Sequence, residues 1–327
     1  MKISLVQMNS QLDRDSNLRA AENLMLQAIA RDTPDLIVLP EHFDWSGGTV
    51  AEKLAAADHM PGGDAYRMLQ AFAARQKVWI HGGSLLERVD GSSKIYNTTV
   101  VFDPEGNEVG RYRKVHLFDI EAPDGKMYRE SATVAPGESL FVYESGGFRI
   151  GCAICYDLRF PRLFDALADA GVDVVILPAA FTLQTGKDHW EVLCRARAIE
   201  HQVYFVACGQ WGGYTAADGD RRFTYGNSLV CDPWGQVIAR AVDQVGVVSA
   251  HLDLDRVAAV RKLIPAASHK VSFVDQARVN RGCSRSERCN SSCSSPVQTF
   301  GAPISSTAST HKLWHHILVA TSFTAAR

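Results

Sequence analysis

The 327-residue sequence contains no apolar segment long enough to cross a membrane and no excess of charge of either sign. A membrane-spanning helix needs about 20 consecutive apolar residues, and no stretch of the sequence approaches that length. The apolar start, residues 1–9, gives way to Gln11, Asp13 and Arg14, so it is shorter than the core of a signal peptide. We therefore expect a cytoplasmic protein that does not associate with membranes.

The charged residues are close to balance, with 34 Lys and Arg against 36 Asp and Glu and a formal net charge of -2. A protein without a strong field of one sign has no general attraction for nucleic acid or for an anionic membrane surface. The composition, 46% hydrophobic and 21% charged, is typical of a globular protein with one large core. We expect a small-molecule partner and no nucleic-acid partner.

The eight cysteines are too sparse for a disulfide framework, which is a feature of short secreted chains. Five of them lie in apolar or helical stretches typical of free thiols: Cys152, Cys155, Cys194, Cys208 and Cys231. The other cysteines and the histidines near them have spacings that match no regular zinc finger: Cys283, Cys289, Cys293, His311, His315 and His316. We expect free thiols in a reducing compartment and no metal site.

Apolar runs rich in β-branched residues alternate with helical patterns over residues 1–275, which is typical of an α/β domain with largely buried strands. The expected strands are residues 3–7, 36–39, 78–84, 95–102, 108–115, 148–154, 172–177, 203–208, 228–231, 237–239 and 247–252. The expected helices are residues 16–31 with Ser16 or Asn17 as cap, 64–75 with Asp64 as cap, 159–170, 187–201 and a short helix after Asp255. Residues 276–327 are dominated by small and polar residues, and we expect a low-complexity, disordered tail there.

Three reactive side chains, Glu41, Lys114 and Cys155, each fall at or beside the carboxyl end of an expected strand. Such ends are where α/β folds place their chemistry, so the three can meet over one edge of a sheet. A carboxylate can take the proton of a thiol, and a lysine ammonium favours the thiolate. Lys114 and the backbone N–H after Cys155 can also hold the negative charge that appears on a carbonyl oxygen under attack. This pattern predicts a cysteine-nucleophile hydrolase that needs no cofactor.

Several separated strings then resemble the nitrilase superfamily of carbon–nitrogen hydrolases. The strings that carry the chemistry are residues 39–41 (LPE), 112–119 (YRKVHLFD) and 155–161 (CYDLRFP). Further matching strings are residues 82–84, 94–98, 189–193, 195–200 and 232–235. Because they agree in order and spacing over about residues 1–275, together they are far more specific than any single motif.

The resemblance implies a fold and a set of roles. The fold is a four-layer αββα sandwich that commonly forms homodimers or larger homo-oligomers. Glu41 is then the general base, Lys114 the oxyanion stabiliser and Cys155 the nucleophile, while Glu130, in the string 128–131, is the second glutamate that positions the lysine and the substrate. The reaction is the hydrolysis of a linear amide through a thioester on Cys155, with release of ammonia from a primary amide.

Within the superfamily, residues 94–98 and 116–120 resemble the branch that contains omega-amidase and deaminated-glutathione amidase, which act on terminal amides of small carboxylate substrates. The substrate-binding candidates are Arg159, as the cation for an anionic group, with Tyr156, Phe181 and Thr182. Residues 195–200 also resemble the N-carbamoyl amino acid amidohydrolases, so that activity and nitrile hydrolysis stay open as alternatives. A nitrilase-like scaffold without turnover is the alternative outside enzymes.

Two other chemistries compete for the same residues. Cys152 and Cys155 have the spacing of a redox dithiol, but Cys152 falls inside an expected strand rather than at a helix N-terminus. In an extended strand the two thiols would also point to opposite faces. His116 could act as the base of a Cys–His pair, but its position beside Lys114 at the same strand end favours a supporting role. Arg159 could instead pair with Asp157 or Glu200.

Overall fold

The computed structural model describes residues 1–122, 125–216 and 218–271. The boundary expected after residue 275 and the tail expected over residues 276–327 lie outside these residues. The described part of the chain forms a unit of its own, Met1–Val271. None of its helices combines the length and the apolarity that crossing a membrane requires.

The first sheet has seven strands, in the order β17-β1-β2-β3-β5-β4 with β6 paired to β5. Its strands are β1 Lys2–Gln7, β2 Leu36–Val38, β3 Trp79–His81, β4 Leu85–Arg88, β5 Ile95–Phe102, β6 Glu108–Arg113 and β17 Gly246–His251. The central strands β1, β2 and β3 are parallel. They are almost wholly buried, because both faces of the sheet are covered, and this explains their largely apolar sequences.

The second sheet has six strands, in the order β16-β15-β12-β11-β10-β9. Its strands are β9 Val142–Ser145, β10 Phe148–Cys152, β11 Val174–Ala179, β12 Tyr204–Gly209, β15 Leu229–Cys231 and β16 Val237–Arg240. Here β10, β11 and β12 are parallel, so their carboxyl ends share one edge. Two separate hairpins complete the strands: β7 Asp119–Glu121 with β8 Met127–Arg129, and β13 Trp211–Thr215 with β14 Arg221–Tyr225.

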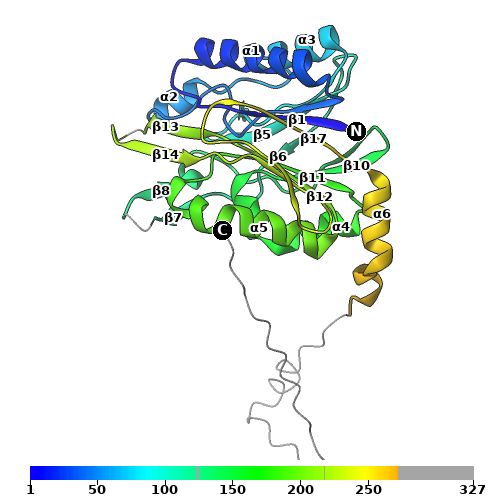
Figure 1. Cartoon of the computed structure of the whole chain (residues 1–327). Helices are drawn as coiled ribbons and strands as arrows, with labels where there is room; N and C mark the ends of the chain where they lie inside the picture. The colour runs from blue at the N-terminus through cyan, green and yellow to red at the C-terminus, as the bar shows by residue number, and fades with distance from the viewer. Residues whose placement is uncertain (123–124, 217, 272–327) are drawn as a thin grey trace, which may run out of the picture. The chain divides into compact units, whose positions relative to one another are not determined.

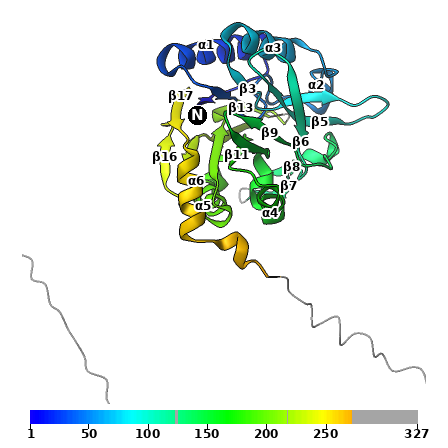
Figure 2. The same ribbon diagram turned by 90° about the vertical axis from the view of Figure 1, so that its right-hand side faces the viewer.

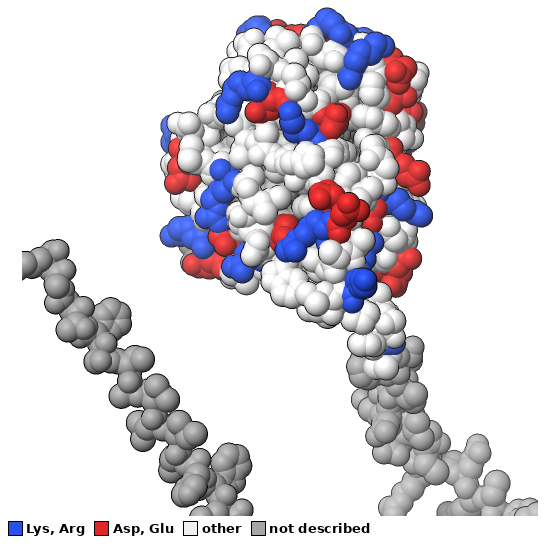
Figure 3. Space-filling view, turned by 45° about the vertical axis from the view of Figure 1, so that its right-hand side comes forward, with Lys and Arg blue, Asp and Glu red and all other residues white. Residues whose placement is uncertain are grey.

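The helices form the outer layers of a four-layer αββα sandwich, which confirms the expected fold class (Figures 1 and 2). In Figure 1, α1 (Arg14–Asp32) and α3 (Asp64–Gln76) lie above the two sheets, and α4 (Pro161–Asp169) and α5 (Leu183–His201) lie below them. The remaining helices are α2 Val50–Ala55, α6 Leu254–Leu263 and the 3-10 turns Glu130–Ala132, Cys155–Arg159 and Ala266–His269. Acidic and basic side chains intermingle on the face shown in Figure 3.

The principal core lies between the two sheets. Ile3 and Leu5 of the first sheet and Ile150 and Ile176 of the second are fully buried members of one apolar cluster. Burying each such side chain stabilises the fold by roughly 1.5–3 kcal/mol. Cys208 adds a polar link across this layer, because its Sγ donates to the carbonyl oxygens of β1 and β2 residues, at 3.3 Å and 3.4 Å.

Several expected element boundaries are wrong. Helix α1 begins earlier than expected because Asp13, rather than Ser16 or Asn17, is the cap, and its side chain accepts from the Ser16 N–H. Gly63 precedes α3 in place of Asp64. The strand expected to run to residue 154 ends at Cys152, since the chain turns into the 3-10 helix that contains Cys155.

Candidate active site

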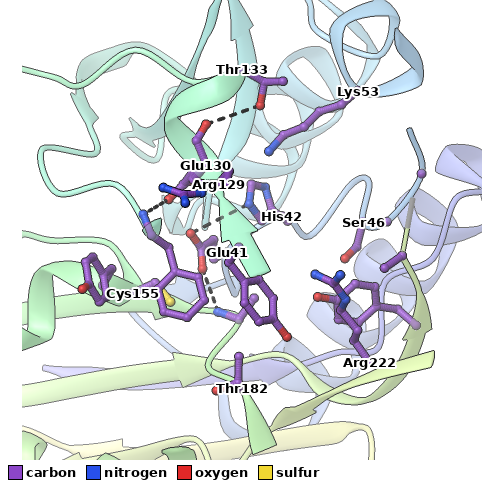
Figure 4. A pocket seen from close by; sticks show the side chains of 18 of the residues that line it. Glu41, His42, Ser46, Lys53, Arg129, Glu130, Thr133, Cys155, Thr182 and Arg222 are labelled. Carbon is purple, nitrogen blue, oxygen red and sulfur yellow. Dashed lines mark hydrogen bonds and ion pairs between the residues drawn. The ribbon is translucent and has the colours of Figure 1, made fainter. Parts of the chain in front are cut away.

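Four chain segments bring the expected catalytic side chains together. Glu41 follows β2, Lys114 follows β6, and Cys155 opens the 3-10 turn after β10. Glu130 opens the 3-10 turn after β8. Glu41 and Lys114 are each 2% exposed and Cys155 is 7% exposed, and all four residues line one pocket (Figure 4). Expected strand ends therefore do converge, from both sheets, at one site.

The Glu41 carboxylate is held at both oxygens. Oε1 accepts from Lys114 Nζ at 3.0 Å and from Asn97 Nδ2 at 2.9 Å. Oε2 accepts from the backbone N–H of Ala180 at 2.8 Å. Ala180 follows β11, a strand of the other sheet. Gln210 Nε2 fixes the main chain below it by donating to the Glu41 carbonyl oxygen at 3.1 Å. The position of this carboxylate is thus set by groups from both sheets.

Lys114 bridges two carboxylates. Besides Glu41, its ammonium donates to Glu130 Oε2 at 2.9 Å and Oε1 at 3.2 Å. Glu130 Oε2 also accepts from the Phe118 N–H at 2.7 Å, and Asn97 Nδ2 lies 3.3 Å from Oε1. Every carboxylate oxygen therefore has a donor. We call Glu41, Asn97, Lys114 and Glu130 the inner cluster.

The Cys155 backbone is strained, with φ of 46°. A non-glycine residue in this left-handed region costs roughly 1–2 kcal/mol, so the surrounding structure must impose the turn. Asp157 does so, because its Oδ2 accepts from the Ile154 N–H and the Tyr112 hydroxyl, both at 2.8 Å. Its Oδ1 accepts from the His116 N–H at 3.0 Å. The nucleophile candidate therefore sits on a braced turn at the end of β10.

The charges of the site follow from burial and from Lys114. Burial opposes ionisation of Glu41, yet the adjacent Lys114 and His42 hold its pKa down at about 2. Burial also works against the Glu130 carboxylate, and again the Lys114 ammonium keeps its pKa below the ordinary value. Burial and the Glu41 charge raise the pKa of Cys155 well above that of a free thiol. At neutral pH the site therefore holds two carboxylates, one ammonium and a neutral thiol beside a base.

The pocket has a volume of about 340 Å³ and includes three of the four expected substrate-binding residues, Tyr156, Phe181 and Thr182. The expectation that Arg159 binds an anionic group of the substrate is wrong, because Arg159 is not among the residues that line the pocket. Its guanidinium lies 4.9 Å from the centre of the Phe181 ring and 3.2 Å from His189 Nδ1, so it supports the wall from behind. The cations that line the pocket are instead Lys53, Arg129, Arg222 and Lys114.

The competing chemistries lose their geometric basis. His116 binds Asp157 through Nδ1 at 2.7 Å and stacks on Phe160 at 3.7 Å between ring centroids, so it braces the turn rather than pairing with Cys155. Cys152 is fully buried in β10 and is a free thiol, as is Cys155. Burial raises the pKa of Cys152, which makes it inert rather than redox-active.

One group of possible metal ligands occurs among the described residues, Glu41, His42 and Glu130, whose ligand atoms lie within 4.8 Å of one another. Both carboxylates of the group already bind the Lys114 ammonium, so each has a cationic partner without an ion. The cysteines and histidines that were weighed as zinc ligands, residues 283–316, lie outside the described residues.

Sequence reasoning missed the group that joins the two carboxylates. Asn97 is fully buried in β5 and donates to both Glu41 and Glu130. Its signal was present, because an amide side chain in an otherwise apolar, buried strand requires partners. The pocket cations Lys53 and Arg222 were also missed, since α2 and β14 were not expected as elements. Nothing in the local sequence of either marks it as part of a site.

The chain matches the carbon–nitrogen hydrolase family model over residues 2–262. It is 42% identical to a deaminated glutathione amidase of Synechocystis sp. over 269 residues, which cover 81% of this chain and 96% of that protein. It is 34% identical to the omega-amidase NIT2 of Mus musculus over 275 residues, 82% of this chain and 94% of that protein.

Solved structures agree with the sequence comparison. The C. elegans NitFhit protein superposes with a TM-score of 0.75 at 34% identity, covering 82% of this chain and 64% of that one. Saccharomyces cerevisiae Nit3, described as a member of branch 10 of the nitrilase superfamily, gives a TM-score of 0.72 at 30% identity, covering 81% and 94%. The expected resemblance is confirmed: the chain belongs to the carbon–nitrogen hydrolase family of the nitrilase superfamily.

Proposed function

We propose that this carbon–nitrogen hydrolase cleaves the terminal amide of a small substrate that carries a carboxylate, with Cys155 as nucleophile, Glu41 as general base and Lys114 as oxyanion stabiliser. The observation that carries the proposal is the placement of the Cys155 thiol in a pocket beside a Glu41 carboxylate that stays ionised at neutral pH. A base next to a buried thiol supplies the thiolate only when the substrate is present, which keeps the resting thiol unreactive.

In the first half of the reaction, Glu41 takes the proton of the Cys155 thiol as the sulfur attacks the amide carbon. The electron pair of the C=O bond moves onto oxygen, where the Lys114 ammonium stabilises the negative charge. The intermediate then collapses and its C–N bond breaks. Glu41 gives its proton to the leaving nitrogen, so a primary amide releases ammonia and leaves a thioester on Cys155.

In the second half of the reaction, water is the nucleophile and the Cys155 sulfur is the leaving group. Glu41 takes a proton from a water molecule, whose oxygen adds to the thioester carbon. The new intermediate expels the sulfur, which regains its proton from Glu41, and the carboxylic acid leaves the pocket. Because Glu41 acts as base and then acid in each half, its pKa must respond to the charge beside it, which the adjacent Lys114 allows.

Glu130 and Asn97 act on this cycle through position. Glu130 fixes the lysine from the side opposite Glu41, and Asn97 holds the two carboxylates apart by donating to both. Two carboxylates this close would otherwise repel each other and raise the pKa of one. We therefore assign Glu130 and Asn97 as positioning residues for Lys114 and Glu41.

The substrate class rests on the relatives and on the pocket. Similar proteins are named deaminated glutathione amidase and omega-amidase, and we carry a terminal amide of a small carboxylate compound over to this chain. The N-carbamoyl amino acid alternative loses its support, because the string that suggested it is structural. Arg197 donates to the Leu158 carbonyl oxygen and pairs with Glu200, and Arg195 donates to the Gly235 carbonyl oxygen.

The test is ammonia or amine release from a panel of 2-oxoglutaramate, succinamate, deaminated glutathione, an N-carbamoyl amino acid and a simple nitrile, with the wild type and Cys155→Ala. We expect turnover of at least one carboxylate-bearing amide, lost in the variant. A folded wild type without turnover on any compound would favour the scaffold alternative. Turnover of the carbamoyl compound or the nitrile alone would overturn the substrate class. The homodimer and the cytoplasmic location expected from the sequence stay predictions.

A further inference from the structure

The side of the pocket away from the inner cluster contains a lysine with no acceptor. Lys53 lies on α2, a short helix capped by Thr49 and Glu52, which bind each other. Its ammonium makes no hydrogen bond or ion pair with any residue that the structure describes. Figure 4 shows the side chain reaching into the pocket, with its nitrogen near the space between Glu130 and His42.

Two carboxylates attract the Lys53 ammonium, but neither bonds to it. Burial and the nearby Lys114 ammonium lower the pKa of Lys53, and the attraction of Glu130 and Glu41 does not restore it. Both carboxylates already have their oxygens filled by Lys114, Asn97 and backbone N–H groups. A partly desolvated ammonium without a hydrogen-bond acceptor is costly, so the pocket gains free energy when a substrate carboxylate accepts hydrogen bonds from it.

A second group on the same side of the pocket is also incomplete. The side chain of His42 is partly exposed, but its Nδ1 is buried and has no hydrogen-bond partner among the described residues. Burial lowers the pKa of its imidazole to about 4, so it is neutral at neutral pH. Its Nε2 lies 3.8 Å from Glu41 Oε1, too far for a hydrogen bond. The ring nitrogen and the ammonium can therefore both bind polar groups of a substrate.

The other cations of the pocket are either paired or exposed to solvent. Arg222 donates to Asp218 at 2.6 Å, and its guanidinium lies 4.5 Å from the centre of the Tyr128 ring, although its Nε has no partner. Arg129 is exposed to solvent, which weakens any ion pair it makes. We call His42, Lys53 and Arg222 the outer wall. Within it, Lys53 is the cation that bonds to no acceptor among the residues that the structure describes.

We propose that Lys53 selects substrates with a carboxylate on the acyl part, by binding that carboxylate and so placing the scissile carbonyl beside Cys155. The inference rests on the proposed amidase function and deepens it. When the leaving group is ammonia, only the acyl part of the substrate can carry a carboxylate. A cation that selects the substrate by its charge must therefore bind the acyl part. A charge-assisted bond at the remote end also orients the reacting end.

The kinetic test compares two amides that differ only in charge, glutaramate and its methyl ester. In Lys53→Met we expect kcat/KM for glutaramate to fall about 10- to 100-fold, mostly through KM, as follows from losing one hydrogen bond to a charged group. We expect the ester to change by less than about 2-fold, and Lys53→Arg to retain most of the discrimination. Lys262→Met, which removes an exposed lysine of α6, is the matched control and should leave both substrates unchanged.

A binding experiment separates this inference from the proposed function. Titration calorimetry with glutarate, the diacid that glutaramate would yield, should show binding to the wild type and a Kd raised about 10- to 100-fold in Lys53→Met. The thermal midpoint of the variant should equal or exceed that of the wild type, since an unpaired ammonium is removed. Equal Kd values for the two proteins, no glutarate binding to the wild type, or an equal loss on both amides would overturn the role of Lys53. Absence of amide turnover with glutarate selectivity intact would instead overturn the proposed function.

Discussion

The two halves of the pocket differ in how completely their polar groups are paired. In the inner cluster every carboxylate oxygen of Glu41 and Glu130 accepts at least one hydrogen bond, and the lysine between them is fixed. In the outer wall, Lys53 has no hydrogen-bond acceptor among the residues that the structure describes, and the buried His42 Nδ1 and Arg222 Nε have no partner there. The inner cluster also contains one unpartnered atom, the buried Asn97 Oδ1. The charged groups of the inner cluster are hydrogen-bonded to one another before the substrate arrives, whereas the Lys53 ammonium is bonded to none.

This difference separates two tasks. Groups that stabilise a transition state work best when they are already oriented, because no reorganisation is then needed during the reaction. Groups that choose a substrate work best when only the right substrate satisfies them, because the wrong one leaves them unpaired. We infer that chemistry belongs to the inner cluster and selection to the outer wall. The following predictions test that division.

The largest effect is expected for the nucleophile. Cys155→Ala should lower kcat by at least about 10⁴-fold, because the covalent route is removed. Cys152→Ala, three residues earlier and fully buried in β10, should keep kcat within a few-fold of the wild type. Acid release under saturating substrate measures both variants. An equal loss in the two would point to a dithiol and contradict the single-cysteine mechanism.

Glu41→Gln should come next. The amide keeps the shape of the side chain but cannot take a proton, so kcat should fall by about 10²–10⁴-fold. The Kd for glutarate should change much less, because selection lies in the outer wall. Calorimetry and steady-state rates measured on the same preparation decide this. A variant that loses glutarate binding along with turnover would show that the two halves are not separable.

Lys114→Met should affect stability as well as rate. Removing the ammonium leaves Glu41 and Glu130 close together without the cation that bonds to both, and breaking a buried ion pair costs about 3–5 kcal/mol. Lys53→Met removes a lysine from the same pocket, yet it should cost little, since Lys53 has no partner. Urea unfolding of the two variants compares them directly. Similar losses would mean that Lys53 is paired in solution.

The smallest effect is expected in the pH dependence. The Glu41 pKa of about 2 and the raised pKa of Cys155 predict a flat kcat/KM for the ester between about pH 5 and 8. For glutaramate, kcat/KM should fall at alkaline pH, because Lys53 has a lowered pKa and loses its charge as pH rises through it. Burial and the Lys114 ammonium lower this pKa, while Glu130 and Glu41 raise it. The neutral His42 also faces Lys53.

Lys53→Arg checks the assignment of that alkaline limb. Arginine stays protonated throughout the accessible range, so the fall with glutaramate should disappear while the acid side is unchanged. Rates are compared at a pH above neutrality with both amides, since the ester serves as the internal control. A fall of equal size for the ester would assign the limb to another group.

The sequence predicted the inner cluster better than the outer wall, for a physical reason. Glu41, Lys114 and Cys155 each follow a strong apolar strand, and the carboxyl ends of such strands meet by the rules of the fold. Asn97 stands inside a strand, and its role depends on which residues the neighbouring strands place beside it. That information is in the pairing of β5 and β6, not in the local sequence.

The outer wall could not be predicted because its elements have no core-facing pattern. Helix α2 has no buried residue, so no apolar stripe marks it in the sequence. The sequence instead points to Arg159, which lies four residues from the nucleophile along the chain. The 3-10 turn that contains Cys155 directs Arg159 to the far side of Phe181 instead.

The hydrogen bond from the Ala180 N–H to Glu41 has a consequence for the way activity is acquired during folding. Glu41 follows a strand of one sheet and Ala180 a strand of the other, and Cys155 comes from the same sheet as Ala180. Neither sheet alone contains both the base and the nucleophile. A chain in which the sheets have formed but have not docked is therefore inactive. The rate at which activity returns after dilution from denaturant reports the rate of docking.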